Sequence, residues 1–112
     1  MELLVEDDKN RISWFKKRIK DLDVAENAED AIDKVAKIKY TRIWLDHDLG
    51  GRVFVDSSDS NTGYAVAKTL AGSVNSSTDV VIHSMNPVGA ANIASLIPHA
   101  RLLVFGTFDI KD

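Results

Sequence analysis

Short apolar runs recur along the chain and are separated by longer stretches in which apolar residues follow a helical spacing. The apolar runs occupy residues 3–5, 22–25, 43–45, 80–82 and 102–105. Brief, continuous runs of this kind are typical of strands that are buried on both faces of a parallel sheet. Their alternation with helices predicts an α/β domain built from right-handed crossovers.

Four helices are expected, beginning near residues 10, 27, 62 and 86. The first is amphipathic, with Ile12 and Phe15 on its apolar face and lysines on the opposite face. Asn27 is a favourable N-cap for the second helix, Gly72 ends the third, and proline follows Asn86 in the first turn of the fourth. The pattern indicates a five-stranded parallel layer of the α/β class.

Composition narrows the class of protein further. The chain has 112 residues, so we expect one domain over residues 1–112. The net charge of −3 gives no bulk attraction to nucleic acid or to anionic membranes. Cysteine is absent, the first residues do not resemble a secretory signal, and no apolar run approaches membrane-spanning length. We therefore expect a cytoplasmic protein with neither nucleic-acid nor membrane partners.

Two features depart from the regular alternation. Residues 50–61 are long for a strand-to-helix connection, and the alternating residues Val53 to Val55 within them indicate a small hairpin or flap. Only seven residues follow Phe105, too few for a closing helix. Long loops in compact domains are frequently functional, so we expect residues 50–61 to lie near the functional site.

Acidic, histidine and hydroxyl side chains follow the apolar runs. In open parallel sheets, ligands bind beyond the carboxyl ends of the strands, where the strand order reverses. The candidate metal-binding acids are Asp7, Asp8, Asp46 and Asp48. If Asp7 or Asp8 lies beside Asp46, their like charges favour a divalent cation, with Mg²⁺ preferred over Zn²⁺ or Mn²⁺. The alternative is that Asp7 and Asp8 cap the following helix.

His47 and His83 have two interpretations. Either could act as a general acid or base near neutral pH or as a zinc-type ligand, and either could be a buried structural histidine. Ser84 and Asn86 lie where a helix N-terminus favours anions, so they could hydrogen-bond a phosphate oxygen. Simple helix capping by Asn86 is the alternative.

These motifs resemble the receiver domains of two-component response regulators. LVEDD after the first strand, WLDHDL at the third and VVIHS at the fourth match the places of the metal-binding acids, the phospho-accepting aspartate and the switch hydroxyl. The resemblance implies strand order 2-1-3-4-5, Mg²⁺ held by Asp7 or Asp8 with Asp46, Asp46 as acceptor and Ser84 as switch residue. The sequence departs from receivers in lacking a lysine after the fifth strand and in lacking the final helix.

A narrower resemblance accounts for these departures. LDHDLGG, TGY opening a helix and VIHSMNPVGAANI are similar to the cyclic-phosphate processing receiver domains. This resemblance implies that His47, Asp48, His83 and Asn86 are site residues beside Asp46. Gly50 and Thr62, which belong to the first two strings, become candidate substrate-binding residues together with Asn86.

We therefore predict a metal-dependent site that processes a small, cyclic or otherwise strained phosphate ester. A metal at Asp8 and Asp46 would polarise the ester. His47 or His83 would activate water or protonate the leaving oxygen, and Ser84 would stabilise the developing negative charge. One alternative is an inactive receiver that binds a protein or small ligand without turnover. Another is a receiver that accepts a phosphoryl group on Asp46.

The missing final helix has a consequence for assembly. In the receiver strand order, the first helix covers one face of the sheet and the other three helices cover the opposite face. Without a fifth helix, strands three to five are uncovered on the side of the first helix. An apolar area of that size rarely remains exposed to solvent in a monomer. We expect Phe54 and its neighbours, residues 108–110, or a second copy in a homodimer to cover it.

Overall fold

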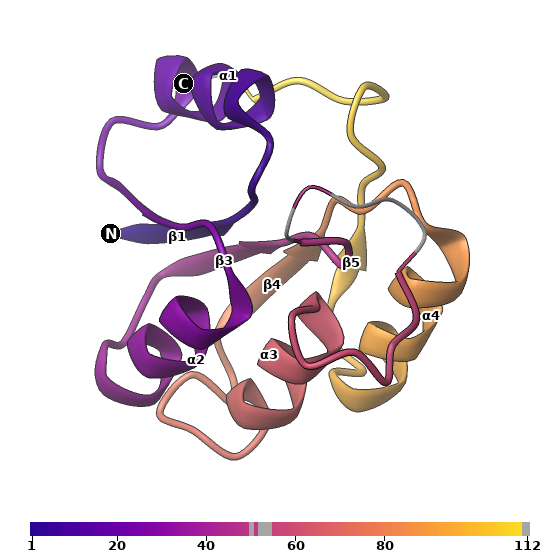
Figure 1. Cartoon of the computed structure of the whole chain (residues 1–112). Coiled ribbons are helices and arrows are strands. Elements are labelled where there is room, and N and C mark those ends of the chain that lie inside the picture. The colour runs from indigo at the N-terminus through magenta and orange to yellow at the C-terminus, as the bar shows by residue number, and fades with distance from the viewer. Residues whose placement is uncertain (50, 52–54, 111–112) are drawn as a thin grey trace.

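The computed structural model describes residues 1–49, 51 and 55–110. Its parallel sheet has the strand order β2-β1-β3-β4-β5, which confirms the flavodoxin-like receiver topology (Figure 1). The strands are β1 (Glu2–Val5), β2 (Leu22–Ala25), β3 (Arg42–Leu45), β4 (Asp79–Ile82) and β5 (Arg101–Leu102). The helices are α1 (Lys9–Arg18), α2 (Ala28–Lys37), α3 (Gly63–Leu70) and α4 (Pro87–Leu96). None of these helices is long and apolar enough to cross a membrane.

The sheet separates two apolar clusters because side chains alternate between its faces along each strand. On one face, Leu3 and Val5 of β1 and their neighbours on β3 and β4 pack under α2, α3 and α4. On the other face, Leu4, Trp44 and Val81 pack against α1. Both clusters are nearly free of solvent, so the three central strands are fixed from both sides.

The end of the chain covers the part of the sheet that a fifth helix would cover. Phe105, Phe108 and Ile110 pack against the cluster around Trp44, and Phe108 lies parallel to the Trp44 ring at 5.7 Å between centroids. Figure 1 shows this yellow segment crossing to the side of the sheet that carries α1. Of the three expected covers, the structure therefore supplies the C-terminal one, while Phe54 lies outside the described residues.

The fifth strand is shorter than the sequence predicts. Apolar residues extend over 102–105, but β5 comprises only Arg101 and Leu102, which pair with Val81 and Ile82. Beyond Leu102 the chain bends toward α1, and the side chains of Leu103 and Phe105 join the cluster around Trp44. The apolar residues that suggested a longer strand are therefore used to cover the sheet. The predicted hairpin at 53–55 lies mostly outside the described residues.

Candidate functional site

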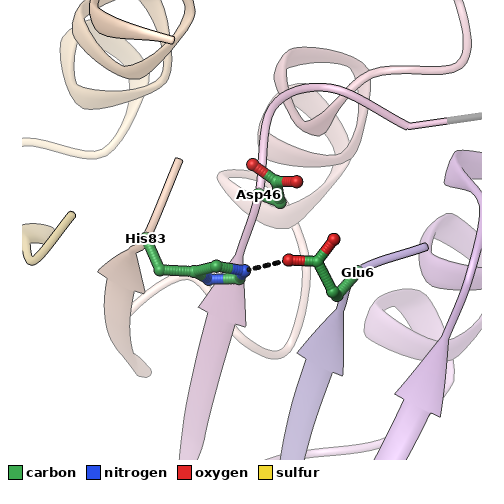
Figure 2. Close-up of side chains that lie close together, drawn as sticks. All are labelled: Glu6, Asp46 and His83. Carbon is green, nitrogen blue, oxygen red and sulfur yellow. Dashed lines mark hydrogen bonds and ion pairs between the residues drawn. The ribbon is translucent and has the colours of Figure 1, made fainter. Parts of the chain in front are cut away.

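Three polar side chains meet where three neighbouring strands end. Glu6 follows β1, Asp46 follows β3 and His83 follows β4, and the register places the last residues of these strands, Val5, Leu45 and Ile82, side by side. One ligand atom from each of the three side chains lies within 4.8 Å of the other two. Figure 2 shows the His83 ring and the Glu6 carboxyl group facing each other beyond the ends of the strands, with Asp46 next to them. We call Glu6, Asp46 and His83 the strand-end cluster.

The strand-end cluster is buried, and burial controls its protonation. Glu6 and His83 are fully buried, and Asp46 is 3% exposed. Loss of hydration raises the pKa of Glu6 to about 7, and it raises the pKa of Asp46 to about 7 with a further contribution from the nearby charge of Glu6. Burial lowers the pKa of His83 to about 4. Near neutral pH the cluster therefore holds a neutral imidazole and two carboxyl groups poised to ionise.

His83 positions Glu6. Its Nε2 lies 3.0 Å from Oε1 of Glu6, and its Nδ1 is buried with no hydrogen-bond partner in the described part of the chain. A neutral imidazole that donates from Nε2 explains both facts, because its Nδ1 then carries no proton. The other oxygen of Glu6, Oε2, accepts the backbone N–H groups of Asp7 and Asp8 at 3.1 and 3.2 Å.

Among the described residues, Arg11 brings a cation next to this cluster. Its Nη1 lies 3.7 Å from Oε1 of Glu6 and 3.9 Å from Oδ2 of Asp46. The Arg11 side chain is 26% exposed, so the guanidinium lies between the buried acids and solvent. Its positive charge lowers the pKa of both carboxyl groups, but burial outweighs this effect.

Asp7 and Asp8 do not belong to the strand-end cluster. Asp8 is the N-cap of α1, and its Oδ1 accepts the N–H groups of Asn10 and Arg11 at 2.9 and 3.0 Å. The carboxylate of Asp7 accepts the N–H of Gly51. The acid that the structure places beside Asp46 is Glu6, because Glu6 is the first residue after β1 and the chain turns toward α1 immediately afterwards.

A second polar group surrounds His47. Nδ1 of this buried ring lies 2.8 Å from Oδ1 of Asp48, and Nε2 lies 2.9 Å from Oγ of Ser57. Asn86 donates from Nδ2 to the same Asp48 oxygen at 3.0 Å, and Asn92 donates to Ser57 at 2.8 Å. These contacts tie the loop before α3 to α4 and hold the imidazole in one orientation.

The remaining candidates have defined local roles. Asn86 caps α4 by accepting the N–H of Gly89 at 3.0 Å, and Ser84 accepts the N–H of Asn86 at 3.0 Å. Thr62 is the buried N-cap of α3, and it forms an isolated antiparallel β-bridge with Asp48. The capping alternative is therefore realised for Asn86 and for Asp8, but not for Asp7. Gly50 lies outside the described residues.

The structure adds Glu6, Arg11 and Ser57 to the residues that the sequence singled out. Glu6 stands directly after an aliphatic run, as Asp46 and His83 do, and that shared position was a usable signal. The contacts of Arg11 and Ser57 depend on how α1 and a long loop pack against the sheet, and no spacing in the sequence indicates them.

Comparisons with known proteins find a matching family model and similar solved structures of receiver domains. A family model described as "Cyclic-phosphate processing Receiver domain" matches residues 1–99. The chain is similar to a CheY-like receiver domain from Methanospirillum hungatei, with TM-score 0.75, 11% identity, and coverage of 96% of this chain and 82% of that one. No curated protein sequence matches.

Two further similar structures contain magnesium. The response regulator TrrA of Thermotoga maritima, in complex with Mg²⁺-BeF, has TM-score 0.69 and 18% identity over 94% of this chain and 87% of that one. The receiver domain of the sensor kinase PA1611 of Pseudomonas aeruginosa, with a magnesium ion in its active-site cleft, has TM-score 0.72 and 14% identity over 94% and 84%. At these identities the likeness establishes the fold.

Proposed function

Because the chain belongs to the cyclic-phosphate processing receiver domain family, we propose that its strand-end cluster binds a divalent cation and a small phosphate ester and hydrolyses that ester. The observation that carries the proposal is the placement of two buried carboxyl groups, Glu6 and Asp46, side by side on adjacent strands. Ionising both groups without a strong counter-charge is costly, since like charges repel and burial removes hydration.

The residues present fit a divalent cation. Carboxylate oxygens of Glu6 and Asp46 are ligands that Mg²⁺ accepts, with water and substrate oxygens completing its shell. His83 would stay on Glu6 and fix that carboxylate in place, as partners of metal ligands commonly do. Direct coordination by the imidazole would instead favour Zn²⁺. The magnesium in the TrrA and PA1611 structures supports the first arrangement.

The chain's own groups supply the remaining chemistry. Lewis-acid activation of a phosphoryl oxygen is what the bound cation would contribute. The Ser84 hydroxyl accepts the Asn86 N–H, so its own proton is available for a phosphoryl oxygen. His47, held by Asp48 and Ser57, is the candidate to take a proton from the attacking water or to give one to the leaving oxygen of the ester.

Metal titration tests the proposed cation site. In a Trp14→Phe background, emission reports on Trp44, two residues before Asp46. We expect Mg²⁺ to change this emission, and Glu6→Gln and Asp46→Asn to abolish the change. Asp8→Asn is the matched control, because asparagine preserves the helix cap and removes only the charge. Equal losses in all three variants, or no response in the parent, would refute the site.

Phosphorus NMR tests turnover. We expect 2′,3′-cyclic or 3′,5′-cyclic nucleotides to give new phosphomonoester signals in the presence of Mg²⁺, and Asp46→Asn to give none. His47→Gln should slow the reaction and leave Mg²⁺ binding within about twofold, since His47 lies outside the strand-end cluster. Metal binding without new signals from any cyclic phosphate would contradict hydrolysis.

A binding module without turnover is the second candidate. One observation favours it: the rings of His47 and His83 are both fully buried, so neither faces solvent directly. On this alternative the nucleotides bind but stay intact.

Incubation with acetyl phosphate followed by intact-mass measurement addresses phosphorylation of Asp46, since an added phosphoryl group that is absent in Asp46→Asn would identify an acceptor.

A further inference from the structure

Two carboxylates and a divalent cation together carry no net charge, so attracting a phosphate group takes a further cation, and the residues directly after β5 do not supply one. Residues 103–107 contain neither lysine nor arginine. Within the described part of the chain, the guanidinium that forms ion pairs with Glu6 and Asp46 is that of Arg11, on the first turn of α1. Arg11 therefore reaches the site from α1.

Arg11 is held in place, and within the described part of the chain its contacts leave donors available for a ligand. Its Nη2 donates to Sδ of Met85 at 3.1 Å, and its guanidinium carbon lies 5.2 Å from the centroid of the Phe105 ring. The distances of 3.7 and 3.9 Å to the acids are longer than charged hydrogen bonds, which fall near 2.7–2.9 Å. Because the side chain is 26% exposed, these donors are accessible to an anion from solvent.

The charges at the site explain why Arg11 and a metal would act together. With both acids ionised, the two carboxylates and the guanidinium of Arg11 together carry one net negative charge, which repels phosphate. A divalent cation alone, without Arg11, would only neutralise the two carboxylates. With both cations present the site becomes positive by one charge, which attracts a phosphate group.

We propose that Arg11 binds a phosphoryl oxygen of the ligand when a divalent cation occupies Glu6 and Asp46, and that it competes with this cation when no anion is bound. This inference rests on the proposed metal site. Planar guanidinium groups match phosphate oxygens in a bidentate manner, and the contacts with Met85 and Phe105 orient this one beside the acids.

The two roles of Arg11 predict opposite effects of one substitution. Arg11→Gln should bind Mg²⁺ about threefold tighter without an anion, because a competing positive charge is removed. In saturating Mg²⁺ it should bind inorganic phosphate about tenfold weaker, because a charged hydrogen-bonding partner is lost. Arg11→Lys should keep the Mg²⁺ affinity of the parent and still bind phosphate more weakly, since lysine lacks the planar fork.

Calorimetric titrations of Mg²⁺ alone, and of inorganic phosphate in saturating Mg²⁺, measure both effects. Lys9→Gln is the matched control: it removes the same charge from the same helix, at a side chain that pairs with Glu26 instead of the cluster. It should change either affinity by less than about twofold. Circular dichroism confirms that the variants fold.

The outcomes separate the two proposals. If the parent fails to bind Mg²⁺, the proposed metal site is wrong and the role of Arg11 falls with it. If the parent binds Mg²⁺ but Arg11→Gln binds it more weakly, or binds phosphate as the parent does, the metal site stands and the inference about Arg11 is overturned. Effects of equal size in Lys9→Gln would likewise overturn it, since they would arise from net charge alone.

Discussion

The two buried carboxyl groups make folding depend on pH. Burial raises the pKa of Glu6 and of Asp46 to about 7, so the folded protein keeps protons that the unfolded chain releases near pH 4. Their contribution to stability is fully present below their ordinary pKa values and is lost as the pH rises through 7. His83 acts in the opposite sense, because its pKa falls to about 4 and its contribution is lost as the pH falls from 6.5.

We therefore expect the metal-free protein to be less stable at pH 7.5 than at pH 5.5, by about 2 kcal/mol, since two carboxyl groups outweigh one imidazole. Denaturant unfolding in a chelator at the two pH values measures this difference. Asp23 and Asp79 have lowered pKa values and titrate below this range. Glu6→Gln and Asp46→Asn should each reduce the difference, and saturating Mg²⁺ should stabilise the protein more at pH 7.5. Stability that rises with pH in the chelator would contradict the assignment.

At the scale of residues, the sequence predicted part of the site. Asp46 and His83 were identifiable because each follows a buried strand, and Glu6 obeys the same rule. The structure places Asp7 and Asp8 outside the strand-end cluster, since pairing between β1 and β3 ends at Val5 and the next residue, Glu6, faces the cluster. Arg11 and Ser57 reach their partners only through tertiary packing, which periodicity does not encode.

At the scale of elements, two helices begin in close contact with the site. The N–H of Gly63, at the start of α3, donates to the carbonyl of His47 at 2.8 Å, and a Cβ at Gly63 would lie 1.9 Å from the carbonyl oxygen of Asp46. A Cβ at Gly89 in α4 would lie 2.3 Å from the His47 ring. Glycine at these positions lets the helices pack directly on the segment that carries Asp46 and His47.

Gly63→Ala should therefore destabilise the protein by about 3 kcal/mol and displace Asp46, because the added methyl group meets backbone that has no room to move. Thermal unfolding measures the stability, and the Trp44 titration measures the loss of Mg²⁺ affinity. Gly72→Ala is the control, since nothing lies within 4 Å of its added Cβ. Unchanged stability and metal affinity in Gly63→Ala would show that α3 does not constrain Asp46.

The elements themselves were more predictable than their ends. The order of strands and helices followed from apolar periodicity, and Asn27, Thr62 and Asn86 cap helices near the expected starts. The length of β5 was not predictable in this way, because residues 103–105 are equally suited to a strand and to covering an apolar face. The contacts of Leu103 and Phe105 with the cluster around Trp44 show which of the two uses the fold makes of them.

At the scale of the whole molecule, the C-terminal segment takes the place of a helix. Phe105 and Phe108 form edge contacts with Trp14 of α1, and Phe108 also stacks on Trp44. Arg18 of α1 holds the segment further by an ion pair with Asp109 at 2.7 Å. The sheet face, α1 and the chain end thus form one apolar unit, and the surface that suggested a homodimer is covered within a single chain.

This arrangement predicts that the covering segment controls self-association. Phe108→Ala combined with Ile110→Ala should expose the Trp44 side of the sheet, shift tryptophan emission to the red and destabilise the protein by about 2 kcal/mol. Sedimentation velocity should show a monomeric parent and a variant that associates as its concentration rises, because apolar surface that is exposed to water favours association. Val74→Ala is the control. Because the Val74 side chain is already 55% exposed, this substitution should leave the emission, the stability and the state of association unchanged. A parent that is dimeric while Phe108 remains packed would instead place the dimer contact elsewhere on the molecule, since this face is already occupied.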